Sequence, residues 1–290
     1  MTAIAPPEDI WLRAGDIRLH VRKWDGKSLP FILLHGLASN SRTWDAVAEA
    51  LNQAGYLVFS VDQRGHGSSD KPAHGYGFDE VTADLRELIE TMHLAEPPIL
   101  AGQSWGGNVV LEFAARYPKL ARGLVLVDGG FLELSTRPGA TWEKIAVDLR
   151  PPDLAGRQRV ELAARLRAAH PGWTESGIEA TLNNFETLPD GTVRPWLSLD
   201  RHMEILRALW EHRPPGLYAG IESPVLIAPA SEAENSEWTR LKRIQVEKAA
   251  MAIPRCKVRW FPATDHDIHV HRPRDLAGVI LEAVSDGFFS

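Results

Sequence analysis

Two kinds of hydrophobic pattern alternate along most of the chain. Short apolar runs rich in β-branched residues predict strands at 17–24, 30–34, 57–61, 99–102, 123–127, 225–228 and 257–261. Between them, apolar residues recur at helical spacing in 44–54, 78–93, 105–117, 237–253 and 274–284. Strands that alternate with helices form βαβ units, so the pattern predicts an α/β fold with a mostly parallel, twisted sheet flanked by helices.

The alternation stops near residue 131 and resumes near residue 223. A structureless loop of that length would be unusual in a compact domain, so we interpret 131–222 as an inserted helical cap subdomain. Residues 1–130 and 223–290 then form the core domain. Within the cap, 199–210 predicts an amphipathic helix, and the turn signal at 189–192 predicts a connection between two short strands. Four tryptophans lie in the insertion: Trp142, Trp173, Trp196 and Trp210.

Composition narrows the class of protein. The 290 residues are 44% hydrophobic with a formal net charge of -6, and no basic run offers a footprint for nucleic acid or an anionic membrane. Cys256 is the one cysteine, so neither an internal disulfide nor a cysteine-based zinc site can form. The first residues lack the basic start and apolar core of a secretory signal, and we expect a cytoplasmic protein. The oligomeric state stays open.

The sequence Gly102-Gln103-Ser104-Trp105-Gly106 follows a predicted strand and opens a predicted helix. A nucleophile on such a strand–turn–helix needs glycines on both sides, because side chains there would collide with neighbouring backbone. Ser104 would then project above the sheet at a helix N-terminus, where the backbone N–H of Trp105 can stabilise an oxyanion. We therefore predict that Ser104 is the nucleophile of a hydrolase.

The strand at 30–34 runs into His35-Gly36-Leu37, which resembles the first catalytic loop of the α/β-hydrolase fold superfamily. The resemblance implies that the Leu37 N–H is the second oxyanion donor and that Gly36 permits close approach of substrate. We expect His35 to be structural. We also place His35, Gly36, Trp105 and His269 among the substrate-pocket residues. The following loop, with Asp62 and Arg64, resembles a segment that supports the site in this superfamily.

The order nucleophile, acid, histidine in this superfamily places the base after the last strand. His266 stands there, seven residues before the proline that opens the final helix. It would take the Ser104 proton and return it to the leaving group. His269 and His271 are competing candidates, and the spacing of the three histidines could also suggest a metal. We expect neither metal nor cofactor, because few other ligands are near and the resemblance implies none.

The position of the catalytic carboxylate differs from the one that is commonest in this superfamily. Many relatives place an aspartate after the strand at 225–228, at the position of Ala233 here, and alanine cannot orient an imidazole. Glu232 and Glu234 flank it, and Glu234 is the alternative acid. Other members of the superfamily use the preceding strand, which ends here at Asp128. The carboxyl edge of a parallel sheet is where catalytic groups gather, so we assign the acid to Asp128.

A serine nucleophile favours acyl transfer over displacement by an aspartate. We predict a serine esterase or lactonase that cleaves a small, largely apolar ester through an acyl-enzyme. Alternatives are a proline iminopeptidase-like enzyme, a carbon–carbon bond hydrolase, a perhydrolase, or a non-catalytic ligand-binding protein on a hydrolase scaffold. The sequence does not distinguish ester, lactone and prolyl amide substrates.

Overall fold

The computed structural model describes residues 6–232 and 236–290 and contains an eight-stranded sheet with the order β1-β2-β4-β3-β5-β6-β9-β11. Strands β1 and β2 pair antiparallel with each other, β2 pairs antiparallel with β4, and the remaining neighbours are parallel. The main strands are β1 Glu8–Ala14, β2 Ile17–Trp24, β3 Ser28–Leu34, β4 Tyr56–Val61, β5 Ile99–Gln103, β6 Gly123–Val127, β9 Val225–Ala228 and β11 Cys256–Val258. The predicted α/β-hydrolase fold with a mostly parallel sheet is confirmed.

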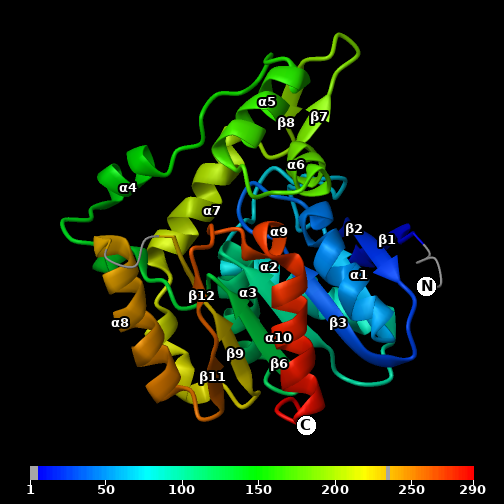
Figure 1. Ribbon diagram of the computed structural model, residues 1–290, viewed down its shortest axis with the longest axis vertical. Coiled ribbons are helices and arrows are strands. Elements are labelled where there is room, and N and C mark those ends of the chain that lie inside the picture. The colour runs from blue at the N-terminus through cyan, green and yellow to red at the C-terminus, as the bar shows by residue number, and fades with distance from the viewer. Residues whose placement is uncertain (1–5, 233–235) are drawn as a thin grey trace.

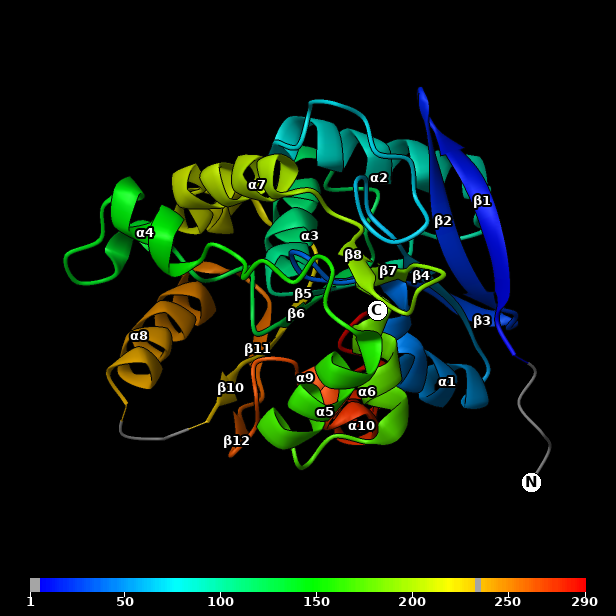
Figure 2. The same ribbon diagram turned by 90° about the horizontal axis from the view of Figure 1, so that it is seen from above.

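Helices cover both faces of the sheet. The core helices are α1 Asp45–Gln53, α2 Phe78–Met92, α3 Trp105–Arg116, α8 Glu237–Ala252, α9 Ile268–His271 and α10 Pro273–Ser285. Seen from above, α2 and α3 lie on one side of the sheet and α1 and α10 on the other (Figure 2). Because both faces are covered, the central strands are continuously apolar rather than alternating.

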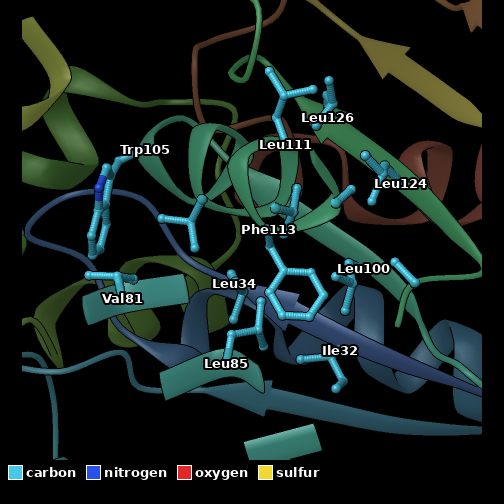
Figure 3. Close-up of a cluster of buried hydrophobic side chains, with 14 of the residues drawn as sticks. Ile32, Leu34, Val81, Leu85, Leu100, Trp105, Leu111, Phe113, Leu124 and Leu126 are labelled. Carbon is cyan, nitrogen blue, oxygen red and sulfur yellow. The ribbon is translucent and has the colours of Figure 1, made fainter. Parts of the chain in front are cut away.

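The side chains of the central strands divide between two hydrophobic clusters. Ile32 and Leu34 point to the α2–α3 side, whereas Phe31 and Leu33 point to the α1–α10 side. On the α2–α3 side, Phe113 lies in the middle of the cluster with strand residues beneath it (Figure 3). This packing fixes β5 and α3 on either side of Ser104.

Residues 131–222, predicted as the cap, contribute no strand to the large sheet. Their longer elements are α4 Trp142–Asp148, α5 Arg159–Ala169, α6 Glu175–Leu182, α7 Leu199–Glu211 and the hairpin β7 Phe185–Thr187 with β8 Val193–Pro195. Figure 1 shows α4 to α7 and the hairpin above the sheet. The amphipathic helix and the hairpin turn were predicted, and both are present. The division into core and cap subdomains stays a prediction.

One predicted strand, 257–261, is broken in two. Strand β11 ends at Val258, and the separate short strand β12 (Phe261–Pro262) pairs with β10 (Ala230–Ser231). Pro229, between β9 and β10, has no N–H to donate across this ladder, so regular pairing stops there. The chain beyond β12 then turns over the sheet edge and carries His266.

Candidate active site

Ser104 occupies a strained turn between β5 and α3. Its backbone has φ 52 and ψ -120, a region that residues other than glycine rarely adopt. The turn is held by a hydrogen bond from Ser104 N to Val127 O at 2.9 Å and another from Gly107 N to Ser104 O at 2.9 Å. A Cβ on Gly102 would lie 2.1 Å from Gly106 O, which explains the small residues around the turn.

Asp128 follows β6 directly and is almost fully buried, with 1% of its side chain exposed. Its carboxylate accepts a hydrogen bond from Ala230 N at 2.9 Å. Its other oxygen, Oδ2, accepts one from His266 Nδ1 at 2.6 Å. An ionised carboxylate can only accept, so Nδ1 carries the imidazole proton and Nε2 keeps a free lone pair.

The His266 ring is the accessible member of this pair, with 45% of its side-chain surface exposed. Burial opposes protonation of His266, but the hydrogen bond and negative charge of Asp128 outweigh it and raise the pKa above its ordinary value. Burial alone would raise the pKa of Asp128, yet its contacts with His266 and Lys242 hold that pKa below the ordinary value. Asp128 is therefore an ionised carboxylate beside a basic imidazole.

Lys242 of α8 was not among the predicted site residues. Its Nζ lies 2.8 Å from both carboxylate oxygens of Asp128 and 2.8 Å from Ala230 O. Its side chain is 5% exposed, so this is a buried ion pair. The sequence does indicate that Lys242 is buried, because it shares a helix face with the buried Val246 and Ala249, at spacings of four and seven residues.

Ser104, His266 and Asp128 line one cavity of about 560 Å³ together with Leu37 and Trp105. Its apolar walls include leucines from the segment after β6 and from α7: Leu132, Leu134, Leu149, Leu206 and Leu209. Polar side chains, among them Asn108, His202 and Thr239, line it as well. A second hollow of about 170 Å³, which Gly36 lines, shares Leu37, Ser104 and His266 with the first. Ser104 thus faces space on two sides, as a nucleophile between an acyl group and a leaving group requires.

The two predicted oxyanion donors lie on segments that are held in place. Trp105 is the first residue of α3, where backbone N–H groups have no acceptor within the helix. On the other side, a Cβ on Gly36 would lie 3.1 Å from Ser104 Cβ, so this loop passes close to the serine. Ala38 N donates to His66 Nε2 at 3.2 Å, which fixes the loop just after Leu37.

Two of the predicted pocket residues lie behind the site instead of on the described cavity walls. His35 is completely buried; Nδ1 donates to Gly36 O at 2.7 Å and Nε2 accepts from Gln63 N at 3.1 Å. His269 is 1% exposed, packs 4.7 Å from Trp44 between ring centroids, and burial lowers its pKa to about 3. The apolar packing beneath α9 takes the His269 side chain away from the cavity.

The remaining candidates have other neighbours. His271 Nδ1 accepts from Asp265 N at 3.1 Å, away from the Asp128 carboxylate. Arg64 pairs with Asp84 at 2.6 Å, and Asp62 pairs with His20 at 2.8 Å, so the two loop charges do not bind each other.

Glu232 lines the cavity, whereas Glu234, the alternative acid, lies outside the described residues.

The loop of His266 is also tied to the residues above it. Asp265 accepts hydrogen bonds from Trp173 Nε1 at 2.9 Å and from His170 Nδ1 at 3.0 Å. Both partners belong to the connection between α5 and α6. The predicted cap therefore contacts the chain one residue before the predicted base.

The model of the family described as "Alpha/beta hydrolase family" matches residues 31–279. The chain belongs to the α/β-hydrolase family. Among curated relatives, it is 28% identical over 277 residues to 2-(acetamidomethylene)succinate hydrolase of Mesorhizobium japonicum, covering 94% of this chain and 92% of that protein.

Solved structures agree on the fold. A crystal structure of E-2-(acetamidomethylene)succinate hydrolase aligns with a TM-score of 0.80 at 24% identity, covering 96% of this chain and 99% of that chain. An esterase from Exiguobacterium antarcticum aligns with a TM-score of 0.72 at 18% identity, covering 95% and 98%. No helix in 6–232 or 236–290 is long and apolar enough to cross a membrane.

Proposed function

We propose that this protein is a serine hydrolase that cleaves a small, largely apolar carboxylic ester or lactone through an acyl-enzyme. The observation that carries the proposal is the 2.6 Å contact between His266 Nδ1 and Asp128 Oδ2 on the cavity that Ser104 lines. Ser104 is the proposed nucleophile, His266 the base and Asp128 the acid.

In the first step the Ser104 Oγ attacks the carbonyl carbon, and His266 Nε2 accepts the hydroxyl proton. The carbonyl π electrons move to its oxygen, which the N–H groups of Leu37 and Trp105 would stabilise. Asp128 holds the Nδ1 proton and stabilises the imidazolium without accepting that proton.

Collapse of the tetrahedral intermediate breaks the bond to the alkoxy group, which takes the proton from His266 Nε2 and leaves as an alcohol. Water then gives a proton to His266 and attacks the acyl carbon, and Ser104 leaves with that proton restored. For a lactone, the alcohol stays joined to the acyl group and the product is a hydroxy acid.

The leucine-lined walls support a largely apolar substrate. A cavity of about 560 Å³ lies within the range usual for small-molecule sites. Trp105 lines it as well, with its indole 2% exposed and 5.4 Å from His66 between ring centroids. These apolar walls would exclude water from the developing oxyanion and strengthen its hydrogen bonds.

A second candidate comes from the relatives. One relative, which aligns over 94% of the chain, is named 2-(acetamidomethylene)succinate hydrolase, so that compound belongs in the substrate screen. Prolyl amides and carbon–carbon bond substrates belong there too, because the same three residues would serve those reactions. A non-catalytic ligand-binding protein would turn over none of them.

The test is stopped-flow hydrolysis of a short 4-nitrophenyl ester. We expect a burst of 4-nitrophenolate close to one equivalent per active site, followed by slower turnover, and loss of both in Ser104→Ala. Absence of turnover across ester, lactone, prolyl amide and acetamidomethylene substrates would refute the enzyme proposal and favour the binding protein.

A further inference from the structure

A positively charged side chain on the segment after β6 also lines this cavity. Arg137 directly follows the short 3-10 helix η2 (Leu134–Thr136) after β6. Its side chain lines the same cavity as Ser104 and His266. The mechanism above gives it no role.

None of the described carboxylates forms an ion pair with Arg137. The buried Nε has no hydrogen-bond partner among residues 6–232 and 236–290, and no ion pair to Arg137 occurs within those ranges. Burial lowers the pKa of the guanidinium, while the charge of Asp148 acts in the opposite direction. Arg137 is half-buried, and leaving its buried Nε–H without an acceptor costs free energy; such unpaired groups are frequent at ligand sites.

The two described carboxylates on the cavity, Asp128 and Glu232, do not form an ion pair with Arg137. Asp128 is already bound by Lys242 and His266. Glu232 is exposed and makes no ion pair with Arg137. Within the part of the chain that the structure describes, no carboxylate on the cavity binds Arg137, so its donors are available to a bound anion.

The guanidinium is also held in place before any ligand arrives. Its central carbon lies 4.3 Å from the Trp238 ring centroid, so the indole supports one face of the group. Gln245 of α8 donates to Thr136 Oγ1 at 2.6 Å and to Glu133 O at 3.3 Å, which fixes the turn that carries Arg137. Stacking on one face leaves the N–H edges of a guanidinium free for a planar anion.

We propose that Arg137 binds a carboxylate of the substrate, so that the substrate is an ester with an anionic end reaching along the apolar cavity. The inference rests on the proposed serine hydrolase function and narrows its substrate class. One guanidinium matches one carboxylate in charge and in its paired donor geometry. A phosphate dianion would leave charge unbalanced between leucine walls.

Two matched pairs of esters test the proposal, each pair differing only in the carboxylate. Monomethyl adipate and methyl hexanoate place the charge on the acyl side, whereas 4-acetoxybutanoate and butyl acetate place it on the alcohol side. Binding to Ser104→Ala is measured by calorimetry, which needs no turnover. In at least one pair we expect the charged ester to bind about 10- to 100-fold more tightly, as a charge-assisted hydrogen bond implies.

The variant Arg137→Met keeps the length and the apolar packing on Trp238 but removes the charge. It should erase the preference for the charged ester and leave binding of the neutral ester unchanged. Arg137→Lys keeps the charge without the paired donors and should retain part of the preference. Glu232→Gln is the control for other cavity charges and should leave the preference intact or increase it.

The proposal is overturned if neither charged ester is preferred, or if the preference persists in Arg137→Met. These outcomes are separate from failure of the proposed function. If wild type hydrolyses the neutral esters and Ser104→Ala does not, the hydrolase proposal stands while the carboxylate proposal falls. If wild type hydrolyses no ester but Arg137 still determines carboxylate binding, the hydrolase proposal falls while the carboxylate site at Arg137 stands.

Discussion

The buried ion pair between Lys242 and the proposed catalytic acid leads to a sharp prediction for Lys242→Met. Methionine has a similar length and no charge, so the substitution leaves Asp128 with His266 and the Ala230 N–H as partners. It also leaves Ala230 O without the donor that now lies 2.8 Å away. Both losses occur where the side chains are 5% and 1% exposed.

Breaking a buried ion pair by removing one partner costs roughly 3–5 kcal/mol. Two partners of Asp128 remain, so we expect the low end, about 3 kcal/mol of unfolding free energy. About 1 kcal/mol of this comes from the unpaired carbonyl and is independent of Asp128. In an Asp128→Asn background the same substitution should therefore cost only about 1 kcal/mol, a coupling energy of about 2 kcal/mol.

The assay is urea unfolding of four proteins: wild type, the two single variants and the double variant. A second readout is the pH profile of kcat/KM, because the Lys242 charge lowers the pKa of His266. Without that charge, His266 stays protonated to higher pH, so the acid limb of the profile shifts to higher pH. Equal costs of Lys242→Met in both backgrounds, with an unmoved acid limb, would refute the electrostatic reasoning.

Further predictions concern the acid and the turn at Ser104. Asp128→Asn removes the carboxylate that contributes most to raising the pKa of His266, so the acid limb should move to lower pH while kcat falls by about 10⁴-fold. Glu234→Gln should change neither the acid limb nor kcat. If kcat collapses in Glu234→Gln and stays near normal in Asp128→Asn, the catalytic acid is Glu234 and not Asp128. Gly102→Ala would set a Cβ 2.1 Å from backbone oxygen and should unfold or destabilise the protein by about 3 kcal/mol or more in urea titrations. The control is Gly278→Ala in α10, where no atom lies within 4 Å of the added Cβ, and it should stabilise the protein by up to about 1 kcal/mol. Similar effects of the two glycine substitutions on stability would contradict the packing argument.

Most of the core fold was predictable because its strands are short, continuous apolar runs bounded by helices. β2, β6 and β9 have the predicted bounds. β1 was not predicted, because most of its side chains are exposed and only Ile10, Leu12 and Ala14 pack on the α2 side of the sheet. Its strand conformation depends on pairing with β2, which a local pattern does not reveal.

The site was predictable where a local motif carries the geometry. The glycines around Ser104 encode the turn, and the position of Asp128 after a fully apolar strand encodes its place at the sheet edge. Lys242 could not be assigned in this way: its helix face indicates burial, but no local motif links it to Asp128, 114 positions away. His269 was misplaced for a related reason, since the one-turn helix α9 directs its ring toward Trp44.

We propose that acyl groups are transferred to Ser104 with the help of His266 and Asp128. The most direct measurement is mass spectrometry of protein quenched in acid during the burst with a 4-nitrophenyl ester. We expect one added acyl group, on the peptide that contains Ser104, and none in Ser104→Ala. Turnover without any adduct, or an adduct on another residue that persists in Ser104→Ala, would contradict it.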